Sequence, residues 1–137
     1  MSCLFNSLSY FLDNMNGSQL RRIIVDNMSR DPIIIEPELK VSDIIEYEFR
    51  NMTLTNYIKK MSSSNEWGGA VEIKVFCELF HYKVNVIVLR TRKTIEFIPE
   101  NNVKREITIT WNGSHYEPIK NLFHPPRENK LFTRLLR

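Results

Sequence analysis

Residues 70–89 read AVEIKVFCELFHYKVNVIVL, and the spacing of the apolar residues changes within this stretch. From Ala70 to Phe80 they recur at intervals of three and four, which is the period of one helix face. From Val84 to Leu89 they are mostly β-branched and nearly continuous, as in a strand. The stretch therefore predicts a buried helix followed directly by a strand, with Cys77 on the core side of the helix.

Two more β-branched runs, Thr94–Ile98 and Glu106–Trp111, follow this strand, and charged or turn residues separate them. Helical spacing dominates before residue 70, so helices come first and strands later. The sequence has no regular alternation of strand and helix, no internal repeat and no low-complexity segment. This order is typical of an α+β domain in which helices cover a small sheet.

Three helices are predicted before residue 70. One runs from Cys3 to Leu12, a second follows an N-cap at Ser18, and a third follows an N-cap at Thr53. The segment Ile33–Arg50 fits an extended stretch as well as a helix, so it stays unassigned.

The length and composition allow one domain. With 137 residues, 42% of them hydrophobic, the chain is long enough to form a single core. We place this domain at residues 1–120 and a basic C-terminal extension at residues 121–137. The 19 basic residues exceed the 16 acidic ones only slightly and are scattered through the chain, so we expect no nucleic-acid partner.

The sequence favours a cytoplasmic protein that needs no metal. No stretch approaches the roughly 20 apolar residues of a membrane-spanning helix, and the N-terminus lacks a signal-type pattern, so we expect no membrane contact. The two cysteines, Cys3 and Cys77, form no CxxC pair and no zinc-type cluster with histidine. We therefore expect no cofactor, no metal site and no disulfide framework.

Candidates for a nucleophile and a base lie near opposite ends of the domain. Cys3 falls in the first turn of the first predicted helix, where free backbone N–H groups and the helix dipole favour a thiolate. His115 follows the last predicted strand. Because residues two apart in an extended segment point to the same side, Glu117 can approach the His115 imidazole and hold its tautomer. These residues predict a Cys-His-acid arrangement.

Three motifs in this order resemble those of the ovarian-tumour (OTU) cysteine proteases. Residues 3–8 (CLFNSL) are similar to the family's nucleophile helix, and residues 66–69 (EWGG), followed by Glu72, to its central Trp-Gly-Gly segment. Residues 114–117 (SHYE) are similar to its terminal His-Tyr element. Each motif is short, and their order and family-like distances carry the resemblance.

The resemblance implies a papain-like OTU fold, with helices packed around a small, mostly antiparallel sheet. It implies Cys3 as the nucleophile, His115 as the general base and Glu117 as the third triad residue. Glutamate is one methylene longer than the more familiar aspartate or asparagine at that position. The implied activity is that of a deubiquitinase, a monomer that cleaves ubiquitin or a ubiquitin-like modifier from conjugates, polyubiquitin included.

The sequence departs from the family's pattern just before the nucleophile. The family normally has Asp-Gly-x there, a loop that helps to form the oxyanion hole, whereas only Met1 and Ser2 precede Cys3. We expect either that the natural protein starts upstream or that part of this apparatus is missing. Losing one oxyanion donor lowers the rate roughly a hundredfold to a thousandfold. The alternative function is therefore a catalytically impaired module that binds ubiquitin without cutting it.

Each candidate residue also has a structural explanation. Cys3 fits an ordinary apolar position, His115 a strand end, and Glu117 a solvated surface position nearly as well as a catalytic one. For Trp67 we expect a packed aromatic at a tight turn. A second alternative function is a basic nucleic-acid binder that uses residues 120–137, although aromatic residues are not grouped with these charges.

Overall fold

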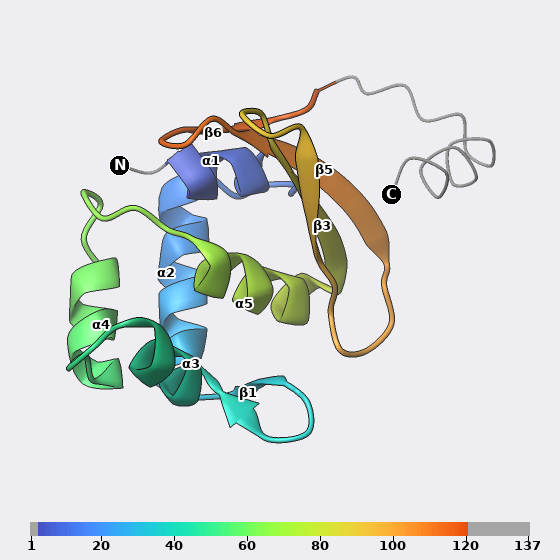
Figure 1. The fold of residues 1–137 in the computed structure, drawn as a ribbon. Coiled ribbons are helices and arrows are strands. Elements are labelled where there is room, and N and C mark those ends of the chain that lie inside the picture. Colours follow the sequence, from blue (N-terminus) through green and yellow to red (C-terminus); the bar gives the residue numbers. More distant parts are fainter. Residues whose placement is uncertain (1–2, 121–137) are drawn as a thin grey trace.

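The computed structural model describes residues 3–120, which form five helices, a four-stranded sheet and a short hairpin (Figure 1). The expected α+β class is confirmed, and the extension expected at residues 121–137 lies outside the described residues. No helix within residues 3–120 is both long and apolar enough to cross a lipid bilayer. The helices are α1 (Cys3–Ser9), α2 (Gly17–Ser29), α3 (Val41–Glu48), α4 (Leu54–Met61) and α5 (Ala70–Phe80); the strands are β1 (Ile33–Ile35), β2 (Leu39–Lys40), β3 (Tyr82–Val88), β4 (Lys93–Phe97), β5 (Arg105–Trp111) and β6 (Tyr116–Pro118).

Side-chain caps fix where α2 and α4 begin. The Asn16 side chain accepts a hydrogen bond from the Gln19 amide at 2.8 Å, and the Gln19 side chain accepts one from the Asn16 amide at 2.8 Å. The cap of α2 therefore lies at Asn16, and the prediction of Ser18 was wrong. Thr53 caps α4 as predicted, with its hydroxyl oxygen 3.1 Å from the amide nitrogen of Asn56.

The first helix is shorter than predicted, because it ends at Ser9 and not at Leu12. The amides of Phe11 and Leu12 donate to carbonyls three residues back, at 3.2 and 3.0 Å. Bonds of this spacing belong to tighter turns than those of an α-helix. α1 therefore has only 7 residues.

The unassigned segment between residues 33 and 50 contains both kinds of structure. β1 and β2 form a short antiparallel hairpin, and α3 begins directly after it at Val41. Asp43 accepts a hydrogen bond from the Lys40 amide at 2.9 Å, which ties the first turn of α3 to the end of the hairpin. Ile34 is the hairpin's buried residue and joins the core.

The four-stranded sheet has the order β4-β3-β5-β6. β3 pairs antiparallel with β4 and parallel with β5, and β5 pairs antiparallel with β6. The three predicted strands are confirmed, and the sheet is mixed: its two outer strand pairs are antiparallel, as expected, whereas its central pair, β3 with β5, is parallel. β6 is an additional strand that the sequence analysis did not assign, because its 3 residues are too few to display a period.

α5 lies between the sheet and α2, at the centre of the core (Figure 1). Cys77 is fully buried on this helix, as predicted, and burial raises the pKa of its thiol to about 12. A thiol with that pKa stays protonated at neutral pH, so Cys77 is a poor nucleophile.

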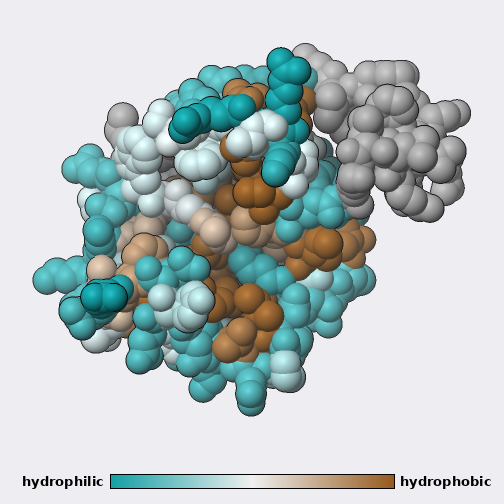
Figure 2. All heavy atoms as spheres, in the orientation of Figure 1, coloured by the Kyte–Doolittle hydropathy of each residue, from teal (hydrophilic) through white to brown (hydrophobic). Residues whose placement is uncertain are grey.

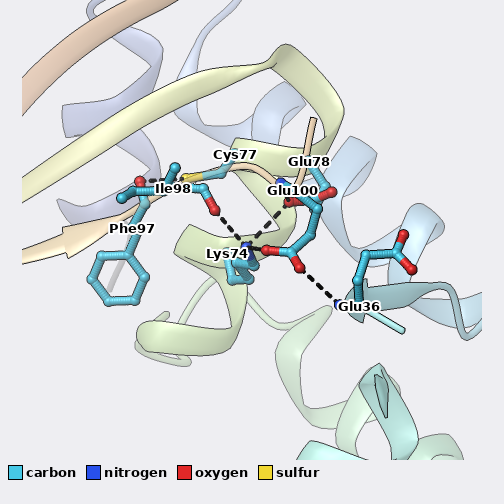
Figure 3. Close-up of polar contacts among 7 residues, drawn as sticks. All are labelled: Glu36, Lys74, Cys77, Glu78, Phe97, Ile98 and Glu100. Atoms are coloured by element: carbon cyan, nitrogen blue, oxygen red, sulfur yellow. Dashed lines mark hydrogen bonds and ion pairs between the residues drawn. The ribbon is translucent and has the colours of Figure 1, made fainter. Parts of the chain in front are cut away.

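A polar cluster attaches the β1–β2 hairpin to α5 (Figure 3). The Lys74 ammonium lies 2.8 Å from a carboxylate oxygen of Glu100 and 3.2 Å from one of Glu78, and it donates to the Ile98 carbonyl. The other carboxylate oxygen of Glu100 accepts a hydrogen bond from the Glu36 amide at 2.8 Å. Glu100 thus links α5 to the hairpin.

Candidate active site

The two ends of the described chain lie side by side. α1 begins at Cys3 and contacts β6, which begins one residue after His115, and Figure 1 shows the two elements next to each other. Burial raises the pKa of the Tyr116 hydroxyl, and the negative charge of a Cys3 thiolate contributes to that shift. The fold therefore brings the helix of the candidate nucleophile to the strand that follows the candidate base.

Cys3 occupies the first position of α1 and is half-buried. The apolar residues after it are inaccessible, with exposed fractions of 1% for Leu4 and 0% for Phe5 and Leu8. A helix of this length is not stable by itself in water, so packing of these side chains decides where it lies. Cys3 is thus held at the edge of the core while its side chain stays partly accessible.

The loop that carries His115 is organised by Asn112. The Asn112 side-chain oxygen accepts hydrogen bonds from the backbone amides of Ser114 and His115, at 3.0 and 2.8 Å. The backbone amide of Asn112 donates to the His115 carbonyl at 3.1 Å. Gly113 has a φ of 104°, a left-handed conformation that suits glycine. Asn112 was not among the residues predicted from the sequence to shape the site, although an Asn-Gly pair after a strand is a strong turn signal.

Glu117 lies near His115 but does not form a hydrogen bond with it. The Glu117 carboxylate oxygen is 3.8 Å from Nε2 of His115, and the two side chains are 70% and 54% exposed. This distance exceeds that of a hydrogen bond and allows a solvent-screened ion pair when the imidazole is protonated. The structure thus brings the predicted acid to the predicted base with only a weak interaction between them.

The Trp67-Gly68-Gly69 segment contacts the nucleophile helix through its glycine. A Cβ atom added to Gly68 would lie 2.8 Å from a methyl carbon of Leu4 and 3.0 Å from the ring of Phe5, so the backbone there is packed against α1. Trp67 is 52% exposed, and the prediction that it is a packed aromatic was wrong.

Trp67 lines an open, mainly apolar cavity of about 500 Å³. The cavity extends from this segment to Ile34 of the hairpin and Phe97 of β4, and Lys74 of the polar cluster forms part of its wall. Apolar side chains gather near the middle of the face seen in Figure 2, surrounded by polar ones. The indole thus lies beside an apolar hollow and outside the packed core.

Two buried ionisable residues, Arg21 and Glu72, were not predicted as functional candidates, although Glu72 follows the segment that resembles the family's Trp-Gly-Gly element. Arg21 is 5% exposed and Glu72 is 1% exposed. Burial lowers the pKa of Arg21 and raises the pKa of Glu72, and the attraction between their charges opposes both shifts. Both lie in helices at positions where charged side chains are usually solvated, so their spacing in the sequence does not indicate that they are buried.

A thiol and an imidazole on neighbouring elements can carry out acyl transfer, in which the thiolate attacks a carbonyl and the imidazole moves the proton. A family model described as OTU-like cysteine protease matches residues 2–117 of this chain. The match includes Cys3, the Trp67-Gly68-Gly69 segment and His115.

Curated relatives carry the name ubiquitin thioesterase OTU1. The chain is 22% identical over 130 residues to that of Mus musculus and 28% identical over 119 residues to that of Saccharomyces cerevisiae. The alignments cover 91% and 86% of this chain but 35% and 36% of the relatives. The chain therefore spans about a third of the length of the curated relatives it matches.

Solved structures share the fold. An ovarian tumour (OTU) domain in complex with ubiquitin has a TM-score of 0.66 and 20% identity, over 98% of this chain and 77% of that one. An OTU deubiquitinase from Wolbachia pipientis wMel bound to ubiquitin has a TM-score of 0.57 and 17% identity, over 85% of this chain and 88% of that one. Because the family model matches nearly all of the described residues, this chain belongs to the OTU-like cysteine protease family.

Proposed function

We propose that this chain is a deubiquitinating cysteine protease in which Cys3 is the nucleophile and His115 the general base. The observation that supports the proposal is the contact of α1, which begins at Cys3, with β6, which begins one residue after His115. Relatives named ubiquitin thioesterase and related folds solved with ubiquitin bound support ubiquitin as the substrate protein.

The reaction begins when His115 accepts the thiol proton of Cys3. The thiolate attacks the carbonyl carbon of the isopeptide bond between the C-terminal glycine of ubiquitin and a lysine, and the bond to the lysine nitrogen breaks. The imidazolium of His115 protonates the departing amine. Water, deprotonated by His115, then hydrolyses the thioester, which releases the ubiquitin carboxylate and restores the thiol of Cys3.

Glu117 has an electrostatic role in this proposal. Its carboxylate lies 3.8 Å from Nε2 of His115, which suits stabilisation of an imidazolium more than a fixed hydrogen bond. Because both side chains are exposed, solvent screens the interaction. We therefore expect its removal to slow the reaction far less than removal of either other member of the triad.

We also propose that the chain acts as a monomer in the cytoplasm, on polyubiquitin among other conjugates, without membrane or nucleic-acid contact. Two unpaired cysteines are typical of a reducing compartment. Bonds between ubiquitin units in a polymer are themselves isopeptide bonds at a glycine carboxyl, so the same chemistry applies to them.

The experiment is reaction with a ubiquitin probe that carries an electrophile at its C-terminus. Wild-type protein and the Cys77→Ala control are expected to form a covalent adduct, whereas Cys3→Ala and His115→Ala are not. An adduct that persists in Cys3→Ala overturns the assignment of the nucleophile. Reversible ubiquitin binding without any wild-type adduct favours the alternative, a binding module without protease activity.

A further inference from the structure

α1 is too short to hold its own position, and the segment packed against it is fixed from inside the core. We propose that Arg21 and Glu72 are positioning residues for Cys3. They hold the two ends of the Glu66–Gly69 segment, hereafter the clamped segment, and so keep Gly68 pressed against the helix that carries the cysteine. The inference rests on the function proposed above for Cys3.

Arg21 holds the first end of the clamped segment. One of its terminal nitrogens donates to the Glu66 carbonyl at 2.6 Å, and the other donates to the Met61 carbonyl at 2.8 Å. The guanidinium also lies over the Phe5 ring, with Cζ 4.3 Å from the ring centroid. A single buried side chain of α2 thereby connects the end of α4, the clamped segment and α1.

Glu72 holds the other end of the clamped segment. One carboxylate oxygen accepts a hydrogen bond from the Gly69 amide at 2.7 Å, and the other accepts one from the Tyr57 hydroxyl at 2.6 Å. Glu72 occupies the first turn of α5, and Gly69 is the N-cap of that helix. The clamped segment is therefore attached to the helix behind it, and Tyr57 of α4 fixes the direction of the carboxylate.

Gly68 transmits this attachment to α1. Its backbone is so close to Leu4 and Phe5 that no side chain fits between them. Phe5 is thus in contact with Gly68 as well as with the Arg21 guanidinium, and it lies two residues after Cys3. A shift of the clamped segment would move the first turn of α1, and with it the sulfur, relative to His115.

The hydrogen bonds of Arg21 and Glu72 distinguish a role in positioning the clamped segment from a role in merely filling space in the core. Apolar side chains of similar size often fill such a space with equal or greater stability, because burying charge has a large desolvation cost. Apolar groups cannot, however, direct hydrogen bonds to the Glu66 carbonyl and the Gly69 amide. Removing the charge while keeping the bond to the Gly69 amide is therefore the informative substitution. Glu72→Gln does this, because its side-chain oxygen can still accept from Gly69 while its NH2 group can donate to the Tyr57 hydroxyl oxygen.

The experiment measures turnover of a fluorogenic ubiquitin substrate, together with urea stability and amide hydrogen exchange of residues 4–8, on the full chain. The variants are Arg21→Met, Arg21→Lys, Glu72→Met and Glu72→Gln. Ile45→Ala is the control for lost stability, because Ile45 is fully buried in α3, which is separate in sequence from the clamped segment and from α1. All rates are taken at a temperature where each variant is folded.

We expect kcat to fall about tenfold to a hundredfold in Arg21→Met and Glu72→Met, since small misplacements of a reacting group have effects of that size. Arg21→Lys, whose single ammonium replaces two separate donor nitrogens, is expected to fall between Arg21→Met and the wild type. Amide hydrogen exchange of residues 4–8 should be faster in the two methionine variants than in the wild type. The kcat of Glu72→Gln should stay within about threefold of the wild-type value, and Ile45→Ala should keep wild-type kcat.

Folded Arg21→Met and Glu72→Met proteins with wild-type kcat would overturn the inference, as would a loss of kcat in Glu72→Gln equal to that in Glu72→Met. If the wild type itself has no activity that depends on Cys3, the proposed function fails. Hydrogen exchange then decides the clamp independently: faster exchange of residues 4–8 in the methionine variants supports it, and unchanged exchange refutes it.

Discussion

Replacing Gly68 with alanine would introduce a methyl group into the contact between the clamped segment and α1. The new Cβ would lie 2.8 Å from a methyl carbon of Leu4 and 3.0 Å from two ring carbons of Phe5. Both side chains are buried, and the Phe5 ring also lies against the Arg21 guanidinium. The Leu4 methyl can move slightly, whereas the ring has little room to do so.

Overpacking of this kind lowers the free energy of unfolding by about 1–3 kcal/mol, and the confined ring places the expected loss near 2 kcal/mol. The measurement is urea unfolding of Gly68→Ala and wild type, with the slope of the free energy against urea unchanged and the midpoint lowered. Because the same contact locates α1, kcat on a ubiquitin substrate is also expected to fall.

Gly69→Ala is the matched control. No atom lies within 4 Å of a Cβ placed at Gly69, so packing does not oppose that substitution. Its expected loss is below about 1 kcal/mol, from replacing glycine by a poorer N-cap residue. Equal stabilities of the two alanine variants, or a Gly68→Ala protein with wild-type stability and kcat, would refute the reasoning.

Three further predictions concern single groups. The hydrogen bond from Lys74, and to a smaller extent that from the Glu36 amide, holds the pKa of Glu100 below its usual value, so the unfolded chain binds a proton at this position before the folded chain does as the pH falls. The stability that Glu100 contributes is therefore present above about pH 5 and is lost as the pH falls below the usual glutamate pKa of about 4.3. In urea unfolding measured across that range, Glu100→Gln should make the decline of stability with falling pH less steep. The same dependence of stability on pH in Glu100→Gln and wild type would count against the ion pair. Native protein treated with iodoacetamide at pH 8 should be modified once, and the thiol of Cys77 should react only after denaturation. Two adducts on the native protein in intact-mass spectra would contradict the burial of Cys77. Asn112→Ala should lower kcat about tenfold, because the loop that carries His115 loses its organising acceptor, with little change in the urea midpoint. Asn112→Asp keeps the acceptor oxygen and should retain kcat near the wild-type value. Equal kcat values for the two variants would exclude the positioning role.

The elements that sequence predicted well are those with a strong local period. Residues 70–89 alone predicted α5 and β3, because a buried helix and a buried strand each require a particular spacing of apolar residues. The N-cap of α2 was predicted at the wrong residue, although the signal for it is local. Asn16 is followed three residues later by Gln19, which completes a reciprocal cap, whereas Ser18 has Arg21 at that position.

Features that depend on distant partners could not be predicted locally. β6 exists because Tyr116–Pro118 pair with β5, and three residues have no period of their own. Arg21 and Glu72 occupy helix positions where charge is usually solvated, and only the packing of α1, α4 and the clamped segment around them buries both. Cys3 and His115 were singled out by their order and motifs, but no local pattern indicated that α1, which begins at Cys3, contacts β6, which follows His115.

The most direct test of the central claim is acid-quenched mass spectrometry during turnover of an isopeptide-linked ubiquitin substrate. The account predicts a transient thioester between the ubiquitin C-terminus and the sulfur of Cys3, detected on the N-terminal peptide and absent in His115→Ala. Turnover without an acyl group on that peptide, or with the acyl group on another residue, would contradict it.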